Sequence, residues 1–402
     1  MKTDLIDSFK QTGEGQVADK ILRSCVHCGF CNATCPTYQL LGDENDGPRG
    51  RIYLIKQMLE GGEVSEKTRT HLDRCLTCRN CETTCPSGVQ YSTLLDIGRN
   101  YIEAHTERPF KERFMRDALA NTLPYRGRFK FFLGAGRVFS PLVPKKLRSK
   151  IPARVAKGKW PAAQHERRML ILDGCVQPTM SPDINSATAR VLDKLGITLV
   201  NIKKAGCCGA VSLHLSKEES AIAMMKHNID AWWPEIENGV EAIVTTASAC
   251  GVMIKDYYEY LHHIPEYGEK ARRISQLCKD ISEIIANEDY SSLATKKSKT
   301  ISWHPPCTLQ HGQKITGVVE KILIDVGYQL NPIKDAHLCC GSAGTYSVLQ
   351  ADLAEKLGDN KIANLEADQP EMIVTANIGC QTHLQERTKT PVKHWIHLLL
   401  DE

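Results

Sequence analysis

The sequence contains no long apolar segment and no segment typical of exported proteins. A helix needs about 20 consecutive, mostly apolar residues to cross a bilayer, and no stretch approaches that length. Residues 1–16 carry Asp4, Asp7 and Glu14 and lack the apolar run of a secretory signal peptide. We therefore expect neither a transmembrane helix nor a signal peptide.

The sequence also lacks the short motifs of common nucleotide and substrate sites. There is no GxGxxG after an apolar strand, no GxxxxGK and no GxSxG. The 402 residues, 42% hydrophobic and 24% charged, suffice for two or three soluble domains. The net charge of +4 is too small to indicate nucleic-acid binding. We therefore expect no nucleic-acid partner, no catalytic residue and no site in this chain that converts an organic substrate.

Cysteine, in contrast, is abundant, and the motif CxxCxxCxxxCP occurs twice. This spacing is typical of 4Fe-4S ligation, in which three thiolates of one loop bind one cluster and the fourth crosses to the other cluster. The first predicted cluster has the ligands Cys25, Cys28, Cys31 and Cys85. The second has the ligands Cys75, Cys78, Cys81 and Cys35. Paired structural zinc sites are the alternative, but the third Cys and the Cys-Pro step exceed what four-coordinate zinc needs.

The region around these motifs is predicted to be helical. Residues 16–24 form a short helix that leads into Cys25, and the long connection between Cys35 and Cys75 contains helical patterns at 48–59 and 65–74. We therefore predict a helical two-cluster ferredoxin domain over residues 1–109. It resembles the cluster domain of the iron-sulfur subunits in succinate dehydrogenase-type complexes.

Residues 110–168 are basic, rich in aromatic residues and broken by Gly and Pro. Basic residues alternate with aromatic and aliphatic ones from 126 to 142, and four more basic residues follow at Lys145, Lys146, Arg148 and Lys150. A basic amphipathic segment of this kind can lie on an anionic bilayer surface. We expect a connector with peripheral membrane contact; packing on a partner protein or on the chain's own core are the alternatives.

The rest of the chain is an internal repeat. Four cysteines recur 130 or 132 residues later, Cys175, Cys207, Cys208 and Cys250 as Cys307, Cys339, Cys340 and Cys380. In both copies short apolar runs alternate with helical patterns, and the cysteines follow the predicted strand ends. We predict two copies of one α/β unit with a mostly parallel sheet, residues 169–295 and 296–402. The fold class is therefore α+β and multidomain: a helical two-cluster 4Fe-4S ferredoxin domain, then two α/β cysteine-rich units.

Four thiols should converge in each unit, because the carboxyl ends of parallel strands meet at one edge of a sheet. A further iron-sulfur cluster or a metal, zinc included, is the favoured interpretation; reactive thiols and plain buried cysteines are the alternatives. The preferred ligands are those of the second unit, Cys307, Cys339, Cys340, Cys380 and His383, before those of the first, Cys175, Cys207, Cys208 and Cys250. His304 and His311 flank Cys307 and could also bind or tune a metal, although an ordinary satisfied histidine is the favoured interpretation of each. Cys278, outside the repeat, is expected in the core.

The 17 cysteines also indicate a compartment. Their number is odd, and iron-sulfur motifs claim eight of them, so a disulfide framework is not expected. We predict a cytoplasmic protein, peripheral on the cytoplasmic face of the inner membrane if the basic connector contacts lipid.

The Cys-Cys-Gly motifs at 207–209 and 339–341 resemble the cysteine-rich domain of heterodisulfide reductase subunits, the anaerobic glycerol-3-phosphate dehydrogenase subunit, lactate-utilisation proteins and glycolate oxidase iron-sulfur subunits. The order of a ferredoxin domain and two such units is most similar to the last family, over nearly the whole chain. The resemblance implies an electron-transfer subunit of a flavin-dependent glycolate, or 2-hydroxy acid, dehydrogenase. It would take electrons from flavin-containing partner subunits that oxidise glycolate to glyoxylate and pass them to quinone or another respiratory acceptor.

A redox subunit of the heterodisulfide reductase or glycerol-3-phosphate dehydrogenase type is the alternative function. In the heterodisulfide reductase relatives, the last Cys of each repeat begins a CxxC pair. Met253 and His383 occupy the partner position in this sequence. Methionine is a weak ligand and histidine a good one, so disulfide cleavage is less expected and the second unit is the better metal candidate.

Overall fold

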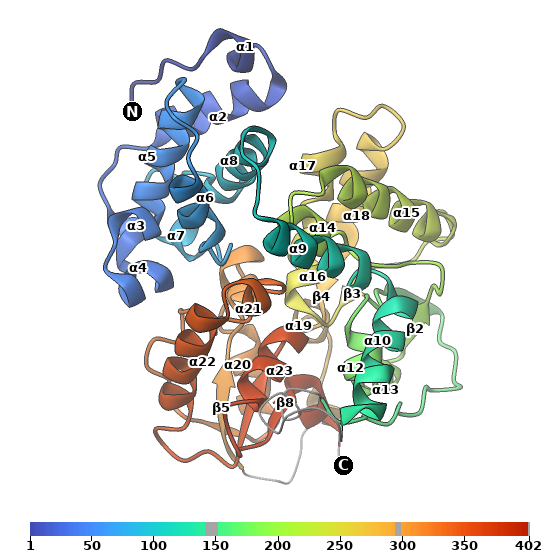
Figure 1. Ribbon diagram of the computed structural model, residues 1–402. Helices are drawn as coiled ribbons and strands as arrows, with labels where there is room; N and C mark the ends of the chain where they lie inside the picture. The colour runs from blue at the N-terminus through green and yellow to red at the C-terminus, as the bar shows by residue number, and fades with distance from the viewer. Residues whose placement is uncertain (141–151, 294–298, 401–402) are drawn as a thin grey trace.

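The computed structural model describes residues 1–140, 152–293 and 299–400. Figure 1 shows a helical N-terminal part at the upper left and two α/β units, one below it and one to its right. Within the described residues, no helix combines the length and the apolar composition that a bilayer crossing requires. Part of the predicted basic segment, namely Leu142, Lys145, Lys146, Arg148 and Lys150, lies outside the described residues.

The N-terminal part is entirely helical in its regular structure, as predicted. Its elements are α1 (Asp7–Lys10), α2 (Gly13–Ser24), α3 (Phe30–Ala33), α4 (Pro36–Leu41), η1 (Glu44–Asp46), α5 (Pro48–Leu59), α6 (Glu66–Asp73), α7 (Asn80–Thr84) and α8 (Tyr91–His105). Pro48 begins α5, where a missing N–H costs nothing, and the Ser65 hydroxyl caps α6 by accepting from Thr68 N. Leu22, Ile55 and Leu94 lie in the core that joins α2, α5 and α8.

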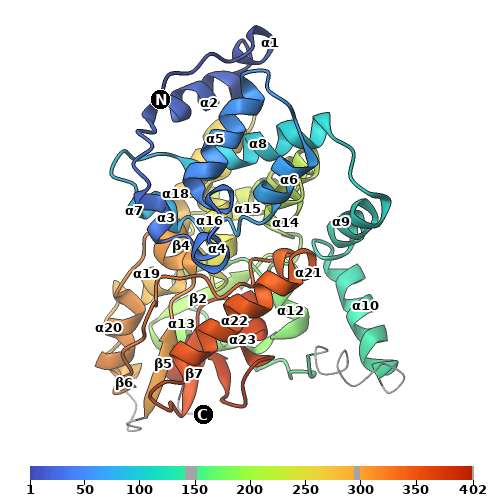
Figure 2. The same ribbon diagram turned by 60° about the vertical axis from the view of Figure 1, so that its left-hand side comes forward.

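Two helices, α9 (Phe110–Thr122) and α10 (Arg126–Val138), form the described part of the connector. Figure 2 shows them along one edge of the molecule, outside the layers of both units. α10 buries none of its side chains and is fixed at its start, where Arg126 pairs with Asp173 at 3.0 Å. The described part of the predicted amphipathic segment is therefore helical from Arg126 to Val138, and it is exposed rather than packed into the core.

The first unit alternates strands and helices. Its elements are β1 (Arg167–Ile171), α12 (Gln177–Met180), α13 (Asp183–Lys194), β2 (Ile197–Asn201), α14 (Ala210–His214), α15 (Glu218–Glu237), β3 (Ile243–Thr245), α16 (Ser248–Lys255), α17 (Tyr257–Leu261), α18 (Gly268–Leu277), β4 (Cys278–Asp280), α19 (Ile281–Ala286) and η3 (Ser291–Leu293). Cys278 is buried in the core at the start of β4, as predicted.

The second unit repeats this order. Its elements are β5 (Thr300–His304), the short π-helix η4 (Thr308–Gly312), α20 (Val318–Asp325), β6 (Gln329–Leu330), α21 (Tyr346–Leu349), α22 (Ala351–Leu365), β7 (Met372–Thr375), α23 (Ile378–Gln385), β8 (Val392–His394) and η5 (Trp395–Leu399).

The two sheets share one topology, which confirms the predicted repeat. Their strand orders are β2-β1-β3-β4 and β6-β5-β7-β8, and every pair is parallel. Leu170 pairs with Ile243 in the first sheet and Ser302 with Ile373 in the second, so the registers also correspond. The fourth strands, β4 and β8, were not predicted.

The two units pack against each other through one continuous apolar core. It contains Ile171 and Val244 from the first sheet and Trp303 and Trp395 from the second unit, all at most 4% exposed. Hydrogen bonds cross the same boundary, because Ser248 N donates to Ala376 O at 3.2 Å and the hydroxyls of Ser248 and Thr308 lie 2.7 Å apart. The two copies therefore form one folded body rather than two independent domains.

Candidate iron-sulfur and metal centres

The eight cysteines of the two CxxCxxCxxxCP motifs lie around two adjoining hollows in the helical part. The first hollow is lined by Cys25, Cys28, Cys31 and Cys85, and also by Cys81, which lines both hollows. The second is lined by Cys35, Cys75, Cys78 and Cys81. Cys35 and Cys85 thus each line the hollow that the other motif's loop surrounds, which is the arrangement that crossed ligation requires. Thiols are the donors that iron-sulfur clusters use, and none of these cysteines forms a disulfide.

Both cysteine loops carry the same unusual backbone. His27 and Thr77, at equivalent positions in the two motifs, have φ of 60° and 53°. The equivalent pair Gly29 and Arg79 has φ of 86° and 59°. Left-handed conformations of non-glycine residues are unfavourable and persist where the surroundings enforce them. They turn each loop around its hollow; Thr77 N, for example, points at Cys75 Sγ across 3.5 Å.

Burial favours the neutral state of some of these thiols in the absence of a bound cation. It raises the pKa of Cys31 to about 11, with the Cys25 thiol as the next contribution, and it raises the pKa values of Cys78 and Cys81 well above the ordinary range. Thiolates bind metals, so binding here releases protons, and only a cationic group compensates the buried negative charge.

Two residues beside the hollows were not predicted from the sequence. Tyr91 at the start of α8 lines both hollows and donates to Cys75 Sγ at 3.6 Å. Arg51 lines the second hollow, is fully buried, and donates to His71 O at 2.7 Å and to the Thr37 hydroxyl at 3.2 Å. A single Tyr or Arg within a helical pattern does not indicate that its side chain lies beside a cluster site.

The second hollow lies against the second cysteine-rich unit. Leu76 and Cys78 share one apolar cluster with Cys307, Cys339 and Tyr346. Polar contacts hold the two parts together, because Asn80 Nδ2 donates both to Thr34 O at 3.0 Å and to His337 O at 3.1 Å. The motif cysteines and the repeated cysteines, which are far apart in the sequence, are therefore neighbours in the fold.

In each unit the four repeated cysteines are in mutual contact, as predicted. In the second, Cys307 and Cys339 have their sulfur atoms 3.7 Å apart, Cys340 and Cys380 have theirs 3.3 Å apart, and Cys339 contacts Cys340. In the first, the thiols make contacts in the order Cys175, Cys207, Cys208, Cys250. Gly209 and Gly341 open the loops with φ of 98° and 89°. Glycine fits there because it has no Cβ to clash in this conformation.

Of the second unit's three candidate histidines, His304, His311 and His383, the last two have hydrogen-bond partners. His311 Nδ1 lies 3.0 Å from the Thr83 hydroxyl and its Nε2 lies 2.9 Å from His337 O. His383 Nε2 lies 3.1 Å from Ala354 O, and burial, followed by the charge of Arg387, lowers its pKa to about 4. His304 is fully buried, and burial lowers its pKa well below the ordinary range.

Comparisons with known proteins agree with this architecture. The family model described as a 4Fe-4S dicluster domain matches residues 21–89, and the one described as a cysteine-rich domain matches residues 169–255 and 301–385. The fold and the paired thiol sites therefore define an iron-sulfur protein with a two-cluster domain and a duplicated cysteine-rich unit.

Individual relatives identify the family. The chain is 54% identical to the glycolate oxidase iron-sulfur subunit of Escherichia coli (strain K12), over 99% of this chain and 98% of the relative. It is 30% identical to the probable glycolate oxidase iron-sulfur subunit of Bacillus subtilis (strain 168), over 89% and 87% of the two chains. The chain belongs to the family of glycolate oxidase iron-sulfur subunits, which confirms the predicted resemblance.

A solved structure supports the fold. That of a hypothetical protein from Helicobacter pylori superposes with a TM-score of 0.54 at 11% identity, over 98% of this chain and 74% of that chain. At this identity the similarity concerns the fold alone.

Proposed function

We propose that this chain is the electron-transfer subunit of a flavin-dependent glycolate dehydrogenase. The observation that supports it most directly is the pair of adjoining hollows lined by the eight motif cysteines. Flavin-containing partner subunits would oxidise glycolate to glyoxylate, which releases two electrons and two protons to the flavin. The electrons would then pass singly through this chain to quinone or another respiratory acceptor.

The ligands that we assign to the first cluster are Cys25, Cys28, Cys31 and Cys85. Those of the second are Cys35, Cys75, Cys78 and Cys81. A 4Fe-4S cluster accepts and releases one electron at a time, at a potential that charge, hydrogen bonds and burial adjust. The chain contributes those adjustments: Arg51 places a buried positive charge beside the second hollow, and Tyr91 directs a hydroxyl to Cys75.

In the second unit we assign Cys307, Cys339, Cys340 and Cys380 to a metal or a further cluster, with His383 and His304 as the two candidate imidazoles. The first unit, with Cys175, Cys207, Cys208 and Cys250, is the weaker candidate. Met253 occupies the position that His383 has in the second unit; it is 4% exposed and lies in an apolar cluster with Trp232. The boundaries that we propose for the four parts are 1–109, 110–168, 169–295 and 296–402.

We further propose that α9 and α10 hold the chain on the cytoplasmic face of the inner membrane. Phe131, Phe132 and Phe139 are 71%, 57% and 59% exposed, and Phe110 of α9 is 74% exposed. Exposed aromatic side chains close to basic residues suit the headgroup region of an anionic bilayer. Sedimentation with vesicles tests this: the chain should bind phosphatidylglycerol vesicles, and the double variant Phe131→Ser, Phe132→Ser should not. Equal binding by both proteins would contradict the proposal.

The main proposal is tested by mixing glycolate with the anaerobic complex of this chain and its flavoprotein partners. The iron-sulfur absorbance should decrease within the time of one catalytic turnover and should recover when a quinone is added. Without the partners, glycolate should leave the absorbance unchanged. If glycolate never bleaches the clusters while a disulfide substrate reoxidises the isolated, reduced chain, a disulfide reductase of the heterodisulfide type is the correct function.

A further inference from the structure

His304 differs from the other histidines of the second unit. It ends β5, its exposed fraction is 0%, and neither ring nitrogen has a hydrogen-bond partner among the described residues. Buried polar groups are nearly always paired, because an unpaired one loses its bonds to water without compensation. A ring with both nitrogens unpaired therefore indicates a ligand that the protein atoms do not supply.

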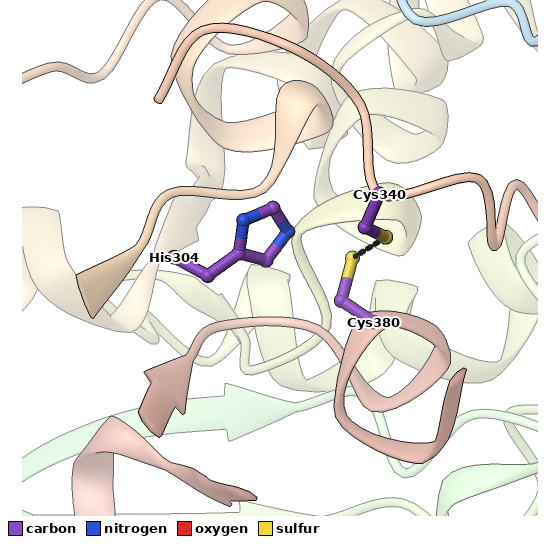
Figure 3. A group of neighbouring side chains, drawn as sticks. All are labelled: His304, Cys340 and Cys380. Carbon is purple, nitrogen blue, oxygen red and sulfur yellow. Dashed lines mark hydrogen bonds between the residues drawn. The ribbon is translucent and has the colours of Figure 1, made fainter. Parts of the chain in front are cut away.

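The side chains next to His304 supply the other donors of a metal site. A ring nitrogen of His304 and the sulfur atoms of Cys340 and Cys380 all lie within 4.8 Å of one another. Figure 3 shows the imidazole directed toward the two sulfur atoms, which lie 3.3 Å apart. Two thiolates on a tetrahedral zinc ion are separated by roughly 3.8 Å, so small side-chain movements would complete the geometry.

The duplication provides a comparison within the chain. Leu172 stands three residues before Cys175, just as His304 stands three residues before Cys307. The strand registers agree, since Leu172 N donates to Val244 O and His304 is paired with Thr375 of the neighbouring strand. Cys208 and Cys250 of the first unit are in contact, as Cys340 and Cys380 are. The first unit therefore has the thiol pair but an apolar side chain in place of the imidazole.

A buried cation is also particular to the second unit. Lys361 of α22 is 3% exposed and its Nζ donates to Asp335 O at 2.7 Å, just before the Cys-Cys-Gly loop. A Cβ added at Gly209 would contact Ala221, and one added at Gly341 would contact Ala354, so these two alanines occupy equivalent positions in the two units. Asn228 and Lys361 each follow seven residues later, and Asn228 is therefore the equivalent of Lys361 in the first unit. Lys361 lies within electrostatic range of Cys340 and Cys339, and its positive charge would offset the single negative charge that the centre carries if Cys339 binds as a third thiolate. The neutral Asn228 offers no such charge.

We propose that His304, Cys340 and Cys380 bind one Zn²⁺ ion. This inference rests on the metal proposed above for the second unit and makes His304, rather than His383, the imidazole ligand. Thiolates and a neutral imidazole are the donors that zinc prefers. The fourth position is open to a further donor such as Cys339, whose thiol contacts that of Cys340. The ion would join the end of β5, the Cys-Cys-Gly loop and α23.

The test uses the full chain, purified anaerobically with its clusters and supplied with Zn²⁺. Zinc per chain is measured by mass spectrometry, and its ligands by X-ray absorption at the zinc edge. The wild type should hold about one zinc with sulfur and nitrogen ligands. His304→Ala should lose zinc to a chelator at least about tenfold more readily and lose the nitrogen contribution, whereas His383→Ala should retain both.

Two controls make the result unambiguous. The iron-sulfur absorbance of each variant reports whether the chain has folded, and if His304→Ala loses it, Cys380→Ser and His304→Gln are measured instead. Any of three results would overturn the assignment. The wild type could hold no zinc, these residues could bind a ninth iron in place of zinc, or the His304 variants could keep the zinc ligation of the wild type. Zinc content does not depend on glycolate, so failure of glycolate to reduce the clusters would refute the electron-transfer proposal without touching this one.

Discussion

At the scale of single residues, the spacing of the cysteines was the main basis for predicting the cluster ligands. The motif cysteines line the hollows that crossed ligation predicts, including Cys35 and Cys85, which line the hollow opposite their own loops, while cluster binding by these thiols stays a prediction. For His304 an ordinary histidine was favoured over a metal ligand, because the sequence does not tell whether a partner lies within reach of a buried ring. Only the fold brings Cys340 and Cys380 to it from two other segments.

The residue that tests ligation with the least structural disturbance is Cys28. It is exposed at the rim of the first hollow, so replacing its sulfur by oxygen leaves the packing nearly unchanged. We expect Cys28→Ser to lose one of the two cluster signals in electron paramagnetic resonance and to lose electron flow, with circular dichroism close to that of the wild type. Cys278→Ser is the control, because Cys278 lies outside both hollows. Wild-type turnover of Cys28→Ser would refute the ligand assignment.

At the scale of elements, periodicity predicted α2, α5 and α6 and the first three strands of each sheet. It missed β4 (CKD) and β8 (VKH) because neither is an apolar run, and both lie beyond the last repeated cysteine. Such short strands are defined by pairing with β3 and β7 rather than by their own pattern. The exposed position of α10 could not be predicted either, since an amphipathic pattern does not reveal what covers its apolar face.

The Cys-Cys-Gly loop of the second unit offers a test of element geometry. At Gly341 φ is 89°, and an added Cβ would lie 2.7 Å from Ala354 O, whereas at Gly344 φ is 63° and nothing lies within 4 Å. We expect Gly341→Ala to lower the free energy of unfolding by several kcal/mol, on the order of 3, because backbone strain and a steric clash combine. Gly344→Ala should cost about 1 kcal/mol, from strain alone. Chemical denaturation of both variants measures the difference; equal losses would contradict this account of the loop.

At the scale of the whole molecule, the contact between the helical part and the second unit is the feature that the sequence did not predict. Linear spacing places Cys78 and Cys307 more than half the chain apart, yet they share one apolar cluster. The two cysteine-rich units were predicted as separate copies, whereas the fold joins them through one core. Both contacts depend on surfaces from distant segments, which no local pattern encodes.

Asn80 tests the contact between the parts. Its side-chain amide bridges Thr34 O and His337 O, so Asn80→Ala leaves two carbonyls without that donor. We expect the interface to be weakened by about 1–3 kcal/mol, seen as faster hydrogen exchange at residues 334–341. Thr84→Ala is the matched control, since its hydroxyl bonds within α7 only to Asn80 O. Unchanged exchange in Asn80→Ala would show that this amide does not hold the two parts together.

The most direct test of the whole account is the iron and acid-labile sulfide content of the anaerobically purified chain, with electron paramagnetic resonance after reduction. Two four-iron clusters predict about eight irons and eight sulfides per chain, with two interacting signals because the hollows share Pro48, Cys81 and Tyr91. Fewer than about six irons in intact, folded protein, or a single isolated signal, would contradict the claim that these motifs hold two clusters.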